Sequence, residues 1–211
     1  MSADATTRQG NALGTVGELA EAWGLRERFE RALQAAYSDK QRVLTARAVR
    51  EALDCAVEIS QRAKTLAGAA YTEQRRIVLN AQLLRAGREP DRDSTFLHEC
   101  AHILADLTHG KACRHGRPWR DVMSLLGEPA EVGHRLDYLS RKAHARISWV
   151  CVACGRKHYF VRKPRRRIED CYCRRCGPND GRLRHMPLDP PIDPVVEAQM
   201  NTSAGDAGGD E

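Results

Sequence analysis

Two histidines and a glutamate between residues 98 and 102 have the types and spacing needed for metal-dependent hydrolysis. His98 and His102 are four positions apart in the run His98-Glu99-Cys100-Ala101-His102, so on a helix both imidazoles project from one face and can hold one metal ion. Glu99 follows the first histidine, where its carboxylate can accept a proton from a metal-bound water. This H-E-x-x-H pattern predicts a zinc protease with Glu99 as general base.

A catalytic zinc normally has three protein ligands and one open position, so a third ligand is required. His115 is favoured, because it lies in Arg114-His115-Gly116-x-x-Trp119 just before a second apolar, helix-like run. The alternatives left open are His109 and the downstream acids Asp121, Glu128 and Glu131. None of these acids lies in a distinctive local motif.

The metzincin arrangement is excluded by two positions. That pattern needs glycine where Ala105 stands and histidine where Thr108 stands.

A helix over about residues 94–108 must position the first two ligands. Apolar residues recur at helical spacing at Phe96, Leu97, Cys100, Ala101, Leu104 and Leu107. Asp93 or Ser94 can cap its N-terminus, and Gly110 follows its last periodic residue. Burial of the apolar stripe would leave the edge with His98 and His102 facing a cleft. The alternative is a solvated helix face that carries two unrelated histidines.

The segments around this helix are predicted from periodicity. Val16 to Tyr37 and Asp39 to about Cys55 predict two packed helices that cover one side of the core, whereas Ala56 to Ser60 is either more helix or a strand. Arg76 to Asn80 predicts a strand from its Ile-Val-Leu run.

After the third candidate ligand, residues 119–126 predict another helix ended by Gly127, with Trp119 as a core anchor rather than a substrate contact. His134, Tyr138 and His144 lie in a polar stretch that we expect to be helical. One of them could donate a hydrogen bond to the oxyanion, although a surface role is favoured for each.

Two cysteine pairs predict a second, structural zinc site. Cys151-x-x-Cys154 and Cys173-x-x-Cys176 have the spacing of a zinc ribbon, in which four thiolates leave no open position for water. Cys171 is a competing ligand, but only Cys173 and Cys176 have the two-residue gap. The remaining thiols, Cys55, Cys100 and Cys113, are expected to be free, with Cys100 buried.

Basic residues concentrate around the ribbon. From residue 141 to residue 185 there are fourteen Lys or Arg against three Asp or Glu, a local net charge of +11. A nucleic-acid contact is predicted for Arg156, Lys157, Tyr159, Arg162, Lys163, Arg165, Arg166 and Arg167, because Tyr159 and Phe160 add stacking surfaces between the charges. Binding would be independent of sequence, to single-stranded or partly melted DNA. The alternative is a solvated basic hairpin.

The motifs together resemble the SprT-like metalloprotease family, whose eukaryotic member Spartan digests proteins crosslinked to DNA. The resemblance rests on His98-Glu99-x-x-His102 with His115-Gly116-x-x-Trp119, on Leu66-Ala67-Gly68 and residues 76–80 upstream, and on Tyr172-Cys173-x-x-Cys176-Gly177 in the ribbon. It runs from about residue 57 to residue 186. It implies that His98, His102 and His115 bind zinc, that Glu99 is the general base, and that a small sheet lies beside the active helix.

Composition is consistent with one ordinary domain and a small appendage. The chain has 211 residues with 5% aromatic and 29% charged residues, so Leu, Val, Ile and Ala must build the core. There is no secretory signal and no transmembrane run, so a cytoplasmic protein without membrane contact is expected, in which paired cysteines bind metal rather than form disulfides. Residues 187–211 are acidic and predicted to be disordered; they could compete with DNA for the basic segment.

The predicted fold is therefore α+β, with a zincin-like metalloprotease core, N-terminal helices and a C-terminal zinc ribbon. Its parts are a disordered lead at 1–14, a helical segment at 15–55, the SprT-like core at 56–146, the ribbon with its basic arm at 147–186, and the tail at 187–211. One catalytic and one structural zinc ion are expected. The predicted activity is peptide-bond hydrolysis in DNA-associated or DNA-crosslinked proteins. The alternatives are a DNA-binding or regulatory protein with an inactive H-E-x-x-H site, and a zinc hydrolase for a non-protein bond.

Overall fold

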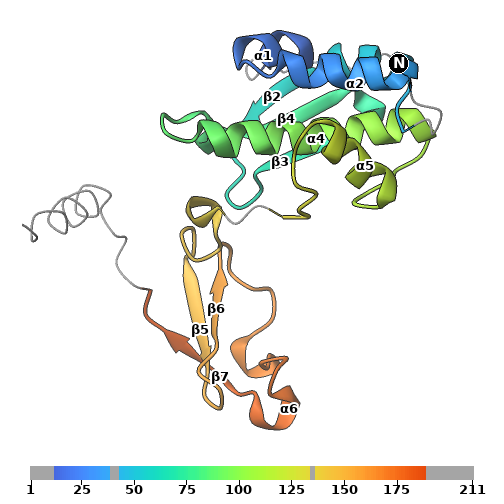
Figure 1. The fold of residues 1–211 in the computed structure, drawn as a ribbon. Coiled ribbons are helices and arrows are strands. Elements are labelled where there is room, and N and C mark those ends of the chain that lie inside the picture. Colours follow the sequence, from blue (N-terminus) through green and yellow to red (C-terminus); the bar gives the residue numbers. More distant parts are fainter. Residues whose placement is uncertain (1–11, 39–42, 134–135, 189–211) are drawn as a thin grey trace, which may run out of the picture. The chain divides into compact units, whose positions relative to one another are not determined.

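The computed structural model describes residues 12–38, 43–133 and 136–188, and the chain divides into two compact units between Leu139 and Ser140. Each unit contains its own sheet (Figure 1). The division lies before the predicted boundary at residues 146 and 147. The mixed α+β class predicted from the sequence is confirmed. Most of the predicted lead and tail, residues 1–11 and 189–211, lies outside the described residues.

The sheet of the first unit has the strand order β1-β2-β4-β3. Its strands are β1 (Ala12–Thr15), β2 (Ala56–Ser60), β3 (Gly68–Tyr71) and β4 (Arg76–Asn80). The inner strands β2 and β4 pair in parallel, and β1 and β3 pair antiparallel at the two edges. The ambiguous segment 56–60 is therefore a strand, buried through Val57 and Ile59. Residues 12–14, predicted to be disordered, instead pair with β2.

The N-terminal helical segment is more divided than its periodicity predicts. It contains α1 (Val16–Ala22), α2 (Arg26–Ser38) and α3 (Ala46–Leu53). A single helix over 16–37 is wrong, because Gly24 has φ 70°, a left-handed conformation that ends a helix. Thr15 and Glu18 form a capping box that fixes the start of α1. Residues 39–42 lie outside the described part of the chain.

The long helix α4 (Glu89–His109) runs across the sheet (Figure 1). It is reached through the short 3-10 segment η2 (Ala81–Leu84). The helix begins at Glu89, earlier than predicted. Pro90 lies in its first turn, where the missing N–H of proline breaks no helical hydrogen bond. Gly110 ends it at φ 64°, as predicted. Phe96, Leu97, Ala101 and Leu104 are fully buried, so the predicted stripe faces the core.

Two further segments complete the first unit. Helix α5 (Arg117–Leu125) buries Trp119, Val122 and Met123 against the core shared with α4, and η3 (Asp137–Leu139) follows. The helical stretch expected around Tyr138 and His144 is wrong: the described residues there form only η3 and turns. Its polar composition offers no apolar stripe to stabilise a helix.

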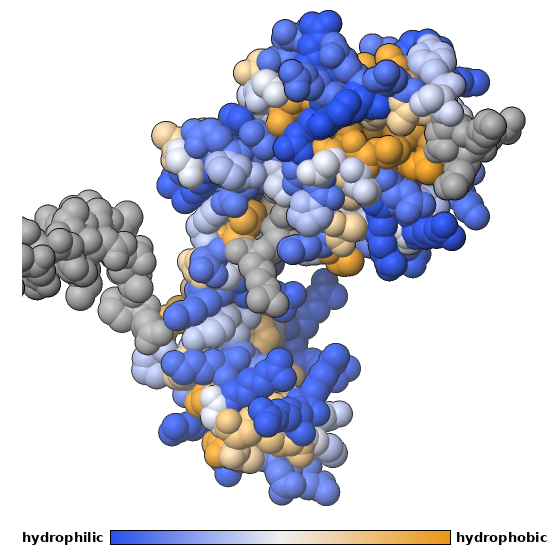
Figure 2. All heavy atoms as spheres, viewed as in Figure 1, coloured by the Kyte–Doolittle hydropathy of each residue, from blue (hydrophilic) through white to orange (hydrophobic). Residues whose placement is uncertain are grey.

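The second unit is a small antiparallel sheet in the order β6-β5-β7. Its elements are β5 (Ile147–Cys151), β6 (Lys157–Phe160), η4 (Ile168–Asp170), α6 (Gly177–Asp180) and β7 (Leu183–Met186). Figure 2 shows mostly hydrophilic residues on the visible face of this unit. Its buried hydrophobic side chains are Trp149, Cys151 and Cys173 among the described residues, too few to form a self-sufficient core. No helix in the described part of the chain is long and apolar enough to cross a bilayer.

Candidate metal and nucleic-acid sites

Three imidazoles converge beside helix α4. His98 and His102 project from the helix, and His115 comes from the loop between α4 and α5. Nε2 of His115 lies 3.1 Å from Nε2 of His98 and 3.2 Å from Nε2 of His102. The three ligand atoms all lie within 4.8 Å of one another.

These separations suit a tetrahedral zinc ion. Zinc–nitrogen bonds of about 2.0–2.1 Å place two ligand nitrogens about 3.3–3.4 Å apart, close to the distances from His115. Three histidine ligands leave one of the four coordination positions open. Burial, followed by the charge of His115, lowers the pKa of His102 to about 4, so this ring is neutral and able to bind a metal at neutral pH.

The alternative third ligands lie elsewhere. Asp121 pairs with Arg117 at 3.6 Å and Glu128 pairs with Arg28 at 2.6 Å. His109 and Glu131 are both exposed and lie outside the metal-ligand group found among the described residues.

Trp119 packs against all three candidate ligands. It is fully buried, its ring is stacked on His102, and its centroid lies 4.7–5.5 Å from the three imidazole centroids. Its Nε1 donates to the backbone oxygen of His98 at 3.4 Å. The prediction that Trp119 is a core anchor is confirmed, but its contact with every imidazole could not be predicted from the apolar stripe. Such an apolar wall restricts water and fixes ring orientation.

Glu99 is buried between helix α4 and edge strand β3. The residue is 7% exposed, and burial raises its pKa to about 7, against the opposing effect of a hydrogen bond from the backbone of Ala70. Gly68 makes this approach possible, because a β-carbon there would lie 2.9 Å from Cγ of Glu99 and 3.0 Å from its Oε1. A carboxyl group with a pKa near 7 is suited to general acid–base work.

Among the candidate oxyanion donors, Tyr138 lies in the same unit as the three histidines and is engaged elsewhere. The hydroxyl of Tyr138 donates to Asp91 at 2.8 Å, and Asp91 lies in the first turn of α4, about two helical turns before His98. His144 belongs to the second unit, and His134 lies outside the described residues.

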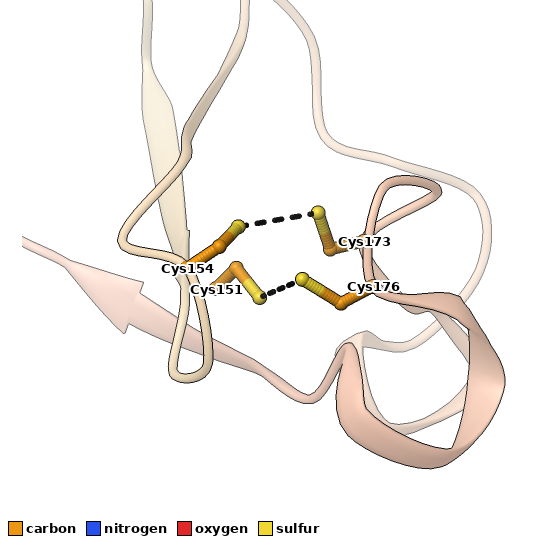
Figure 3. A group of neighbouring side chains, drawn as sticks. All are labelled: Cys151, Cys154, Cys173 and Cys176. Atoms are coloured by element: carbon orange, nitrogen blue, oxygen red, sulfur yellow. Dashed lines mark hydrogen bonds between the residues drawn. The ribbon is translucent and has the colours of Figure 1, made fainter.

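Four cysteine sulfurs form the second candidate metal site (Figure 3). Sγ of Cys151 lies 3.8 Å from that of Cys176, and Sγ of Cys154 lies 3.8 Å from that of Cys173. Tetrahedral zinc with sulfur bonds of about 2.3 Å gives sulfur separations of about 3.8 Å, whereas a disulfide would bring the sulfurs to about 2 Å. Hydrogen bonding by the backbone of Cys154 lowers the pKa of Cys151 to about 7, which favours the thiolate that zinc requires. Cys171 is not in this cluster.

A pocket of about 480 Å³ lies beside the cysteine site in the second unit. It is lined by Trp149, Arg156, His158, Phe160, Pro164, Arg165, Arg166, Cys171, Tyr172, Arg174 and Leu183. Of the predicted nucleic-acid residues, Arg156, Arg165 and Arg166 line it. Lys157, Tyr159, Arg162, Lys163 and Arg167 do not.

Strand alternation explains which aromatic residues face the pocket. His158 pairs with Trp149 across β5 and β6, so these side chains and that of Phe160 share one face, whereas Tyr159 points to the other. Tyr172 is 50% exposed. The sequence did not identify Trp149 and Tyr172 as residues that line this pocket. The alternation of side chains along β5 could have indicated Trp149.

The family model for the SprT-like family matches residues 27–139. The chain is 34% identical over 123 residues to Protein SprT of Klebsiella pneumoniae, covering 56% of this chain and 73% of that protein. It is 32% identical over 117 residues to Protein SprT of Yersinia pestis, covering 54% and 68%. Protein SprT of Pseudomonas aeruginosa is 32% identical over 117 residues, covering 52% and 70%. No solved structure matches the chain. The family match ends where the first unit ends, so the cysteine site lies outside it.

Proposed function

Because this chain belongs to the SprT-like family, we propose that it is a zinc-dependent metallopeptidase with a zincin-like core. The observation that carries this proposal is the convergence of Nε2 atoms from His98, His102 and His115 beside the buried carboxylate of Glu99. A purely structural metal site would not need a base next to its first ligand.

The residues of the site have separate roles in peptide hydrolysis. A zinc ion bound by the three imidazoles would polarise the scissile carbonyl and lower the pKa of the water molecule bound to it. Glu99 accepts the proton of the attacking water and then delivers it to the nitrogen of the departing amine. Burial raises its pKa to about 7 without metal, and a bound zinc ion would lower it towards the carboxylate form that accepts the proton. Trp119 keeps the imidazoles oriented and limits access of water from the core side.

Edge strand β3 is our candidate for substrate binding. The hydrogen bond from Asn80 N–H to the oxygen of Ala67 sets the pairing with β4, so Gly68 and Ala70 direct their backbone groups away from β4. Because the N–H of Ala70 donates to Glu99, an extended substrate can pair with the backbone groups of Gly68 and with the oxygen of Ala70. Because Gly68, Ala69 and Ala70 have small side chains or none, such binding would select little among substrate side chains.

The second unit supports a proposal of DNA binding. Its pocket combines several arginines with the rings of Trp149, Phe160 and Tyr172, the combination that binds phosphates and stacks unpaired bases. Nε1 of Trp149 and Nε2 of His158 are buried and have no hydrogen-bond partner among the described residues. We therefore propose that the protein binds single-stranded or partly melted DNA without sequence preference and cleaves proteins associated with or crosslinked to it.

Protein cleavage tests the proposed activity. A DNA-binding protein is incubated with wild type or Glu99→Gln, each with and without single-stranded DNA. Cleavage by wild type alone, and faster cleavage with DNA, would support a DNA-linked peptidase. If both variants bind DNA and neither cuts, the alternative of a DNA-binding or regulatory protein with an inactive site is favoured.

A further inference from the structure

Asp106 connects helix α4 to the loop that carries the third candidate ligand. It lies one helical turn after His102. Its Oδ1 accepts a hydrogen bond from the backbone N–H of Cys113 at 2.7 Å, and its Oδ2 accepts one from the hydroxyl of Thr72 at 2.9 Å. We propose that Asp106 is a positioning residue for His115, an inference that rests on the proposed zinc site.

The loop that carries His115 has a conformation that needs support. The backbone oxygen of Cys113 accepts from the N–H of Gly116 at 3.0 Å, so His115 lies inside a tight turn. Arg114, directly before it, has φ 48°. This left-handed conformation costs a residue with a side chain roughly 1–2 kcal/mol, and non-glycine residues in such conformations are concentrated at functional sites.

Asp106 holds the beginning of this turn. Cys113 uses its N–H to bind Asp106 and its oxygen to close the turn, so both backbone groups of this residue are fixed. The other end of the turn continues into helix α5, where Trp119 contacts the ring of His115. His115 is therefore held from both sides. Because metal–ligand distances tolerate only about ±0.2 Å, a loop that is free at one end would supply this ligand poorly.

The bond to Thr72 extends the same connection to edge strand β3. Thr72 directly follows β3, and the backbone of Ala70 in that strand hydrogen-bonds Glu99. One carboxylate thus joins the helix of the first two ligands, the loop of the third ligand and the strand beside the general base. Loss of Asp106 would release the loop, whereas loss of the Thr72 hydroxyl would release only the strand.

Zinc affinity of the full-length chain tests this role without measuring catalysis. Zinc is titrated against a competing chelator, and His115→Ala identifies which titration step belongs to the histidine site. Asp106→Ala is expected to weaken that step about 10-fold to 100-fold, the usual effect of losing a group that orients a ligand. Asp91→Ala is the matched control, because Asp91 is another α4 carboxylate with a hydrogen-bond partner, the Tyr138 hydroxyl. It should leave the affinity unchanged.

Two conservative variants distinguish the position of the Asp106 oxygens from the negative charge of the side chain. They also test the proposal if Asp106→Ala does not fold. Asp106→Asn keeps an oxygen for Cys113 and should retain affinity within about 3-fold, whereas Asp106→Glu keeps the charge but displaces the oxygens and should lose about 10-fold. Retained affinity in the Glu variant with loss in the Asn variant would overturn the positioning role. Equal losses in Asp106→Ala and Asp91→Ala would also overturn it. A wild-type titration without any step that His115→Ala removes would contradict the histidine site itself, and with it this inference.

Discussion

Gly68 in edge strand β3 lies so close to Glu99 that a β-carbon on it would meet Cγ of the glutamate at 2.9 Å. The same β-carbon would lie 3.0 Å from Cγ2 of Thr95. The strand and the active helix therefore approach as closely as a residue without a side chain permits, and this approach brings the backbone of Ala70 within hydrogen-bonding reach of the carboxylate.

Gly68→Ala should impair catalysis while leaving the metal in place. The added methyl group must displace Glu99 or move β3 away from α4, and a misplacement of about 1 Å can cost about 100-fold in rate. We expect kcat/KM for protein cleavage to fall by roughly 10-fold to 100-fold with unchanged zinc content. Gly133→Ala is the control, since its β-carbon would have no neighbour within 4 Å. Equal activity of both variants would refute the positional argument.

The sequence predicts contacts between residues that are close together in the chain. It does not predict contacts between distant segments such as β3 and α4. The convergence of His98 and His102 follows from helix geometry, and four thiolates follow from two C-x-x-C pairs. The approach of Gly68 to Glu99 depends on the order of strands in the sheet, which no local pattern specifies. Asp106 was missed for the same reason, because its partners Cys113 and Thr72 lie in other segments.

Helix boundaries show a second limit of the sequence. The predicted helix begins at about residue 94, but proline is tolerated in the first helical turn, so Pro90 does not prevent α4 from beginning at Glu89. Conversely, Gly24 interrupts a periodic apolar run that would otherwise predict one helix from residue 16 to residue 37. In both places a single residue's backbone conformation outweighs side-chain periodicity.

Glu99 should make the stability of the metal-free protein depend on pH. Its pKa is raised to about 7 from an ordinary value of 4.5, so the folded state holds the proton more tightly than the unfolded state. The contribution of Glu99 to stability therefore falls as pH rises from 4.5 to 7, by about 3 kcal/mol at about 1.4 kcal/mol per pH unit. His102 acts in the opposite direction, because its folded-state pKa of about 4 lies below its ordinary value of 6.5. The difference between wild type and a Glu99 variant therefore isolates the carboxyl.

Urea unfolding of chelator-treated wild type and Glu99→Gln measures this effect. The Gln variant should be more stable by about 3 kcal/mol at pH 8 and nearly equal to wild type at pH 4.5. A difference that is constant with pH would mean that the carboxyl is not desolvated as the structure indicates.

Replacement of Trp119 should destabilise the first unit. Trp119→Ala removes a fully buried ring and should cost about 3–5 kcal/mol in the free energy of unfolding. Trp119→Phe keeps an aromatic surface against the imidazoles and should cost less, although it loses the hydrogen bond to the oxygen of His98. Urea denaturation followed by circular dichroism gives both values. A cost below about 1 kcal/mol for the Ala variant would show that this wall of the site is not tightly packed.

The cysteine ligands can be assigned by paired substitutions. Cys173→Ser should lower zinc content by one ion per chain and unfold residues 140–188, because the metal provides most of the folding energy of so small a unit. Cys171→Ser should retain both ions, since Cys171 lines the neighbouring pocket instead. Metal analysis of the two purified variants shows which cysteine is the ligand. Loss of zinc from Cys171→Ser but not from Cys173→Ser would mean that Cys171 is the ligand.

DNA binding should depend on the rings that line the pocket and less on the face of strand β6 that points away from it. Tyr172→Ala removes a ring that lines the pocket and should weaken binding of single-stranded DNA by about 1–3 kcal/mol, the usual contribution of one stacked base. Tyr159→Ala alters the opposite face of β6 and should have a smaller effect. Fluorescence anisotropy with labelled oligonucleotides at several salt concentrations compares the two. A larger loss for Tyr159→Ala would move the binding surface away from the pocket.

The most direct measurement of the central claim is hydrolysis in water labelled with heavy oxygen. Wild type and Glu99→Gln, matched for zinc content, are incubated with a DNA-binding protein and single-stranded DNA, and the fragments are analysed by mass spectrometry. We predict that wild type produces fragments whose new C-terminal carboxyl groups carry the heavy oxygen, and that Glu99→Gln produces none. Equal fragments from both proteins, or no fragments from the zinc-loaded wild type, would contradict the assignment of Glu99 and the three histidines as a peptidase centre.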